Sequence, residues 1–284
     1  MVTTNKTLTN YIYELAGLVN DEELKSALIE SVAASSDVIN KVERFFALLP
    51  SYKWSKEELS QILSSWKATH LKMLAIYGLS CRLQRLAMAT EDTATRAQLM
   101  LASSHNAETS YEDLGLDFGG ETHAQLFHDL AHYLVGDFPW SLEKYCLPRA
   151  SEFRGWIYQN MVVADIQTGL FTNMFSEIYN HAEYSVALGA FGNLIDQQYN
   201  LSPVEREKAL QYVHVHVADE TEVDHFLVVV KALNAYCEAT QTPIDYELAQ
   251  AQILQYLRGI GQVMEALLNL MEPQKNAREL ATVA

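Results

Sequence analysis

The sequence contains few of the residues that build turns, sheets or disulfide frameworks. Its 284 residues include only 12 Gly, 6 Pro and 3 Cys. The cysteines, Cys81, Cys146 and Cys237, are far apart and odd in number. They therefore form neither a disulfide framework nor a zinc cluster, and a reducing cytoplasm is the expected compartment.

Basic residues are also scarce. The 20 Lys and Arg are outnumbered by 36 Asp and Glu, which gives a formal net charge of −16. Because nucleic acids and anionic lipid surfaces repel such a charge, we expect neither nucleic acid nor membrane as a partner. No apolar run approaches the roughly 20 residues that cross a bilayer. The first residues also lack the basic start and apolar run of a secretory signal.

What the sequence does contain is helical periodicity. Strand-like alternation is scarce, and apolar residues recur at spacings of three and four. Ser202, Pro203 and Glu205 form a helix start with a capping box. We predict an all-α protein. Its expected parts are an N-terminal helical arm over residues 1–50, a single helical bundle over 51–272 and a frayed tail over 273–284.

Three long segments read as uninterrupted helices. Apolar spacing continues without a break over residues 55–77, 151–170 and 203–237. The sequence therefore predicts one helix for each segment.

Residues 107–127, AETSYEDLGLDFGGETHAQLF, combine a polar cluster, a glycine-rich break and a helix start. Glu112 and Asp113 end one predicted helix, and His123 lies in the first turn of the next. A carboxylate and an imidazole are thereby held close together. A metal centre needs that geometry, but a capped helix hairpin gives it too, and the spacing alone leaves both interpretations open.

Two further clusters place acids and histidines on helical faces. Glu183 lies on the opposite face from Glu177 and His181, and small residues follow it. A buried unpaired carboxylate is costly, so Glu183 requires a partner or a metal. His216 shares a face with Asp219 and Glu220. A bundle core that collects such groups suits two iron or manganese ions, whereas surface pairs and boundary histidines are the simpler alternative.

The segment AETSYEDLG, its glycine turn and ETHAQLF resemble the signature helix pair of the haem-oxygenase-like di-metal oxidases. That group shares the helical fold of the TenA, PqqC and CADD proteins. The family's metal-binding acid falls on Asp113 and its histidine on His123. Glu183 is the best match to the Glu of the next helix, and His216 is the natural first ligand of the last. The last helix departs from the family spacing, with Val223 seven residues after His216.

The resemblance implies a haem-oxygenase-like bundle that works as a non-haem di-iron oxidase or oxygenase in biosynthesis. It would bind two irons, with manganese as an alternative, and use O₂ on an amino-acid-like or fatty-acid-like substrate. N-oxygenation, oxidative C–C cleavage and desaturation are the expected outcomes. The resemblance also allows a separate electron donor and a homodimer. The candidate metal ligands are Glu112, Asp113, His123, Glu183, His216, Asp219 and Glu220. The candidate cavity walls are Tyr111, Phe127, Tyr179 and Tyr184.

Two other functions remain open. A metal-free enzyme of the same fold would use TenA-like hydrolysis, which needs an activated cysteine, or PqqC-like cofactor-independent chemistry. The hydrolytic version fails if all three cysteines lie away from the central cavity. A non-catalytic interaction protein would instead have a dry, filled bundle centre and use its acidic surface.

Overall fold

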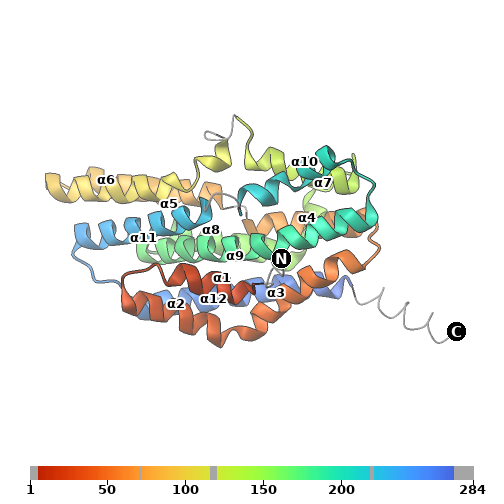
Figure 1. The fold of residues 1–284 in the computed structure, drawn as a ribbon. Helices are drawn as coiled ribbons and strands as arrows, with labels where there is room; N and C mark the ends of the chain where they lie inside the picture. The colour runs from red at the N-terminus through yellow and green to blue at the C-terminus, as the bar shows by residue number, and fades with distance from the viewer. Residues whose placement is uncertain (1–5, 71, 116–119, 218–220, 272–284) are drawn as a thin grey trace.

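The computed structural model describes residues 6–70, 72–115, 120–217 and 221–271, and over these residues every regular element is a helix (Figure 1). The all-α prediction is confirmed. The longer helices are α1 (Leu8–Ala16), α2 (Glu22–Ala34), α3 (Ser36–Leu48), α4 (Lys56–His70), α5 (Met73–Ala89), α6 (Thr93–Glu108), α7 (His123–Val135), α8 (Pro148–Tyr158), α9 (Ile166–Gln198), α10 (Pro203–Val215), α11 (Thr221–Thr240) and α12 (Tyr246–Asn269). The short elements are η1 (Leu49–Ser51), η2 (Glu112–Leu114), η3 (Glu143–Tyr145) and the π-helical turn η4 (Gln159–Val163). Within the described part, no helix has both the length and the apolarity that crossing a bilayer requires.

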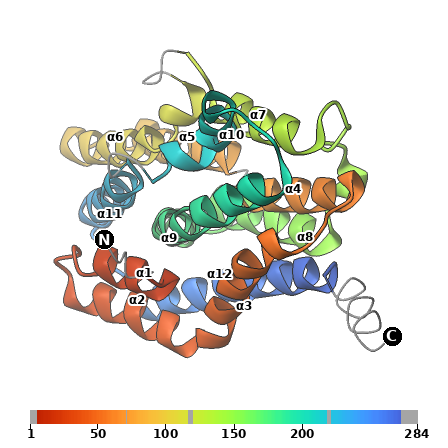
Figure 2. The same ribbon diagram turned by 45° about the vertical axis from the view of Figure 1, so that its right-hand side comes forward.

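Helix α9 runs through the middle of the molecule. It contacts α1, α3, α5, α10, α11 and α12. Figure 2 shows it between α1, α2 and α3 on one side and α5, α7 and α10 on the other. Every residue from 167 to 180 is buried. A helix enclosed on all its faces is normally apolar all round. Any acidic residue of this segment therefore lies in the interior and needs a partner there.

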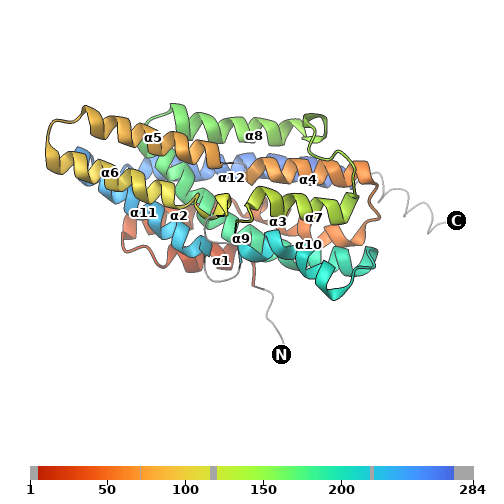
Figure 3. The ribbon, with the colours of Figure 1, turned by 90° about the horizontal axis from the view of Figure 1, so that it is seen from above.

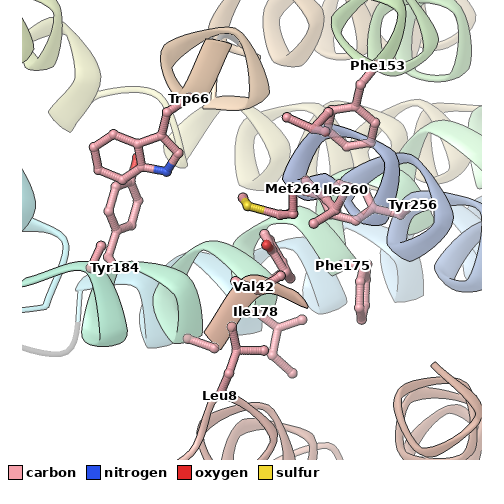
Figure 4. Close-up of a cluster of buried hydrophobic side chains, with 14 of the residues drawn as sticks. Leu8, Val42, Trp66, Phe153, Phe175, Ile178, Tyr184, Tyr256, Ile260 and Met264 are labelled. Atoms are coloured by element: carbon pink, nitrogen blue, oxygen red, sulfur yellow. The ribbon is translucent and has the colours of Figure 1, made fainter. Parts of the chain in front are cut away.

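The N-terminal helices share the core of the bundle. Helix α1 packs on α9, and α2 and α3 pack on α12. Leu8 and Val42 belong to the same buried cluster as Ile178 and Met264 (Figure 4). Residues 8–49 are thus part of one apolar core with the rest of the described chain. The predicted tail, 273–284, lies outside the described residues.

The three long segments predicted as single helices are each divided, which corrects those predictions. Residues 55–77 form α4 and α5, which lie end to end (Figure 3). Residues 151–170 divide at η4, after which the Asp165 carboxylate accepts a hydrogen bond of 2.9 Å from the Thr168 N–H and caps α9. Residues 203–237 divide after Val215. Apolar spacing continues across all three breaks, so the periodicity gave no sign of them.

Helix α5 lies close against α9. A Cβ atom added at Gly169 would lie 2.9 Å from Cδ1 of Leu79 and 3.2 Å from the backbone oxygen of Met161. Real Cβ atoms almost never approach another heavy atom as closely as 2.9 Å, and 3.2 Å is also unusually tight. Glycine at this position therefore permits the approach of α5 to the central helix.

Two glycine substitutions test this close approach. Gly155, exposed on α8, has no heavy atom within 4 Å of an added Cβ. We expect Gly155→Ala to raise the free energy of unfolding by about 0.5–1 kcal/mol, because alanine favours a helix over glycine. We expect Gly169→Ala to lower it by about 1–3 kcal/mol, because the added methyl overpacks the contact. Guanidinium denaturation measures both, and equal stabilisation by the two substitutions would contradict the close packing.

Candidate functional site

The glycine-rich break brings Asp113 and His123 together. Asp113 lies in η2, and His123 is the first residue of α7, whose N-cap Thr122 accepts a 3.1 Å hydrogen bond from the Gln125 N–H. Gly115, with φ +73°, adopts a left-handed backbone conformation and lies against the backbone of Glu121, two residues before His123. Nδ1 of His123 lies 2.7 Å from Oδ1 of Asp113. The His123 side chain is 8% exposed and that of Asp113 26%, so the pair lies at the edge of the interior.

His216 adds a second imidazole to this pair. It ends α10 and is 6% exposed. Its ring centroid lies 4.4 Å from that of His123, and its ring stacks on Tyr184 at 4.0 Å with an interplanar angle of 5°. The Tyr184 hydroxyl lies 2.7 Å from that of Tyr212. Three of the predicted ligands, from three separate segments, therefore form one cluster at the edge of the interior.

Glu183 is completely buried on α9 and is held by two side chains. Its Oε2 lies 2.9 Å from Nε2 of His70. Its Oε1 accepts a 3.1 Å hydrogen bond from the Tyr179 hydroxyl. Burial, followed by the nearby Glu183 charge, raises the pKa of Tyr179 well above its usual value, so Tyr179 remains a hydrogen-bond donor.

His70 is a site residue that the sequence did not indicate. It ends α4, and its ring lies 4.8 Å from that of Tyr184. Tyr184 therefore contacts both His70 and His216. The residue had seemed to lie inside an uninterrupted helix, where a lone histidine gives no functional signal. The sequence did not indicate that α4 ends at His70 and that α5 begins at Met73.

A second buried ion pair lies beside the same break. Nζ of Lys72 is 2.8 Å from Oε2 of Glu177 and donates a 3.1 Å hydrogen bond to Oγ of Ser176. The side chains of Lys72 and Glu177 are only 9% and 2% exposed. The interpretation of Glu177 and His181 as a surface pair is therefore wrong, because position 177 lies in the fully enclosed part of α9.

A cavity of about 80 Å³ opens beside the cluster. The described residues that line it are Lys67, His70, Met73, Asp113, His123, Ala124, Phe127 and Tyr212. Since a water molecule occupies about 30 Å³, there is room for a few waters or for one very small molecule. Of the predicted cavity walls, Phe127 lines it, Tyr184 stacks on His216, and Tyr179 donates a hydrogen bond to Glu183. Tyr111, which lies between α6 and η2, is 45% exposed and is not among these lining residues, and its role as a cavity wall stays a prediction.

The described residues do not assemble a complete metal site. Among them, no group of three or more His, Cys, Asp or Glu side chains has the arrangement that would hold an ion. The side chain of Glu112, together with Asp219 and Glu220, lies outside the part of the chain that the structure describes. The acids and imidazoles present are paired as Asp113 with His123 and Glu183 with His70.

The cysteines do not take part in the site. Cys81 is exposed and Cys146 is half-buried, whereas Cys237 is buried. None of the three lines the cavity. Burial raises the pKa of Cys146 and raises that of Cys237 to about 11, whereas a nucleophilic cysteine needs a lowered pKa. TenA-like hydrolysis therefore has no cysteine nucleophile at this cavity.

Removing the buried lysine tests the ion pair beside the break. We expect Lys72→Met to lower the free energy of unfolding by about 3–5 kcal/mol, because it leaves the Glu177 carboxylate buried without its cation. Adding Glu177→Leu should recover most of this loss. Arg149→Ala, which breaks an exposed pair with Glu152, should cost about 1 kcal/mol or less. If thermal or chemical denaturation gives Lys72→Met the small effect of Arg149→Ala, the pair is not structural.

No protein-family model matches the sequence, and no curated protein matches it either. Among solved structures, the fold is similar to that of a TenA homologue from Pseudomonas syringae pv. tomato str. DC3000. The similarity has a TM-score of 0.61 and covers 86% of this chain and 93% of that chain, at 10% sequence identity. At this identity the likeness shows the fold alone. The predicted haem-oxygenase-like helical bundle is thereby confirmed.

Proposed function

We propose that this chain is a metal-dependent oxidase or oxygenase that uses iron, with manganese as an alternative, and O₂ on a small substrate. One observation carries the proposal. Asp113, His123 and His216 come together from separate segments beside a cavity, and Glu183, buried on α9, pairs with His70, which lines the same cavity. Nitrogen and carboxylate donors of this kind suit iron and manganese, and helical bundles hold such ions between their helices.

The donor chemistry fits a metal, although the described residues do not complete its coordination. Asp113, His123 and His216 would hold an ion at the N-terminal end of α7. Glu183 would contribute a carboxylate ligand from α9. Asp219 and Glu220 remain proposed ligands from outside the described residues. Iron bound there would supply the electrons that reduce O₂. A separate electron donor and a homodimer also remain part of this proposal.

The surrounding side chains exclude water and orient the donors. Phe127 and Tyr212 line the cavity, and the Tyr179 hydroxyl fixes one oxygen of Glu183. Trp66 packs against Phe127 with a ring distance of 5.7 Å. These contacts keep the site enclosed and limit the space beside it to a small molecule or to the reacting end of a larger one.

Lys67 suggests how a substrate would be held. It lines the cavity, and its ammonium group lies over the rings of Phe127 and Trp140, 5.6 Å and 5.0 Å from their centroids. A cation at this position can bind the carboxylate of an amino-acid-like or fatty-acid-like substrate. Burial lowers the pKa of Lys67, and a carboxylate bound beside it would favour the charged form.

A metal-free acid–base enzyme is the second candidate. It is favoured by the observation that Asp113 and Glu183 are each already paired with an imidazole. Such pairs can accept and return protons from a bound substrate without a metal. A non-catalytic interaction protein fits less well, because the apolar interior also contains paired acids and imidazoles beside a cavity.

Metal content separates the two candidates. We expect protein reconstituted anaerobically with Fe(II) to retain about two ions per chain by elemental analysis, as in di-iron bundles, and to consume O₂. Asp113→Ala and His123→Ala should lose most of this iron because each removes a ligand. His132→Ala, which alters a 56% exposed histidine on α7, should retain it. A folded wild-type protein that retains neither iron nor manganese would exclude the oxidase and leave the acid–base enzyme.

A further inference from the structure

We infer that a groove between the start of α5 and α8 binds the apolar chain of an unbranched aliphatic acid whose carboxylate lies beside Lys67 in the cavity. This inference rests on the proposed function, because it takes the cavity as the place of the reacting end of the substrate. Of the two substrate classes in that proposal, it selects the fatty-acid-like one. The cavity alone, at about 80 Å³, has no room for such a chain.

The groove is large enough for a small molecule. Its volume is about 540 Å³, within the usual range of ligand pockets. Helix α8 lies beside the junction of α4 and α5 (Figure 3), and residues of α5 and α8 line the groove from its two sides. Gly155 of α8 is one of them, and an added Cβ there would meet no heavy atom within 4 Å. Free space therefore lies directly against this part of α8.

The lining of the groove is mainly apolar. Leu74 from α5 and Tyr158 from α8 both line it, and they are 76% and 52% exposed. A single exposed apolar side chain is ordinary, but two large ones on opposite walls of one groove present area that a ligand can cover. Among the described lining residues only Arg154 is charged, and its guanidinium already pairs with Glu143 at 2.9 Å. The groove therefore suits a hydrocarbon chain better than the charged groups of an amino acid.

Met73 is the wall that the groove and the cavity share. It is half-buried and lines both of them. A methionine side chain has three rotatable bonds and adapts to irregular spaces, so its movement can open a passage between the two. Lys67 supplies a cation on the cavity side. An acid whose carboxylate pairs with Lys67 would thus extend its chain past Met73 into the groove.

Two acids of different length test this inference on the metal-free protein, without relying on activity. Propanoate reaches the cavity alone, whereas decanoate also fills the groove. Ligand-observed NMR measures the affinity of both. We expect affinity to rise about threefold for each CH₂ group that enters the groove, because the groove removes that group from water. Decanoate should therefore bind about a hundredfold more tightly than propanoate, or better.

Filling the groove separates the chain of the ligand from its carboxylate. We expect Gly155→Phe to weaken decanoate binding by about tenfold or more, because the ring occupies the place of the chain, and to leave propanoate binding unchanged. Gly189→Phe is the matched control. Gly189 on α9 is also exposed, has no heavy atom within 4 Å of an added Cβ and borders two other grooves. This control should bind both acids as the wild type does.

Two further variants examine the opposite wall and the cation. Leu74→Asp places a charge on the α5 side of the groove and should weaken decanoate alone, which guards against a folding defect in Gly155→Phe. Met88→Asp, at a 79% exposed position of the same helix, is its control. Lys67→Met should weaken both acids by the same factor, about tenfold, because it removes the partner of the carboxylate. Circular dichroism establishes that each variant is folded.

The outcomes separate this inference from the oxidase. If folded Gly155→Phe and Leu74→Asp bind decanoate as the wild type does, the groove does not hold the chain and the inference is overturned. Loss of decanoate binding in Gly189→Phe instead, or full binding by Lys67→Met, overturns it as well. None of these results alters iron retention, which tests the oxidase. Conversely, a protein that retains no metal but binds decanoate as expected loses the oxidase proposal and keeps this binding site.

Discussion

The break between α4 and α5 is the constraint on which the site depends. Helix α9 is enclosed by other helices and carries two buried carboxylates, Glu177 and Glu183. Buried acids are tolerated only with partners, and both partners come from the two ends of this break. His70, the last residue of α4, pairs with Glu183. Lys72, the N-cap residue of α5, pairs with Glu177. Continuing a single helix through this point would remove one or both pairings.

The same break forms one wall of the cavity. Met73 and His70 flank it, while Asp113 and His123 approach from the glycine-rich turn on the other side. The rings of Phe127 and Tyr212 also line the cavity. Trp66 and Tyr184 pack against each other beside it, as Figure 4 shows. In such an enclosed setting polar contacts are stronger than in water, and unsatisfied ones are costlier. The acids and imidazoles around the cavity are therefore held in fixed pairs, Asp113 with His123 and Glu183 with His70.

Local features of the sequence predicted much of the fold. Ser202 and Asp21 cap helices through their own side chains, and Thr122 does so immediately before His123. Such caps depend on a few neighbouring residues, so they can be read directly. The placement of Asp113 beside His123 was predictable for the same reason, because a short turn joins them. His70 and Lys72 were not predictable, because their partners lie more than 100 residues away in the chain.

The sequence by itself determined the helical class, the capped helix starts such as that at Ser202, and the polar turn, because periodicity and capping act over a few residues. It also required Glu183 to have a partner, since a buried carboxylate cannot remain alone. Only the tertiary structure decided which partner that is. Apolar spacing runs unbroken from α4 into α5, so the helix break follows from contacts with α9 that no local pattern encodes. The enclosure of α9 likewise turned Glu177, which resembles a surface acid in the sequence, into half of a buried ion pair.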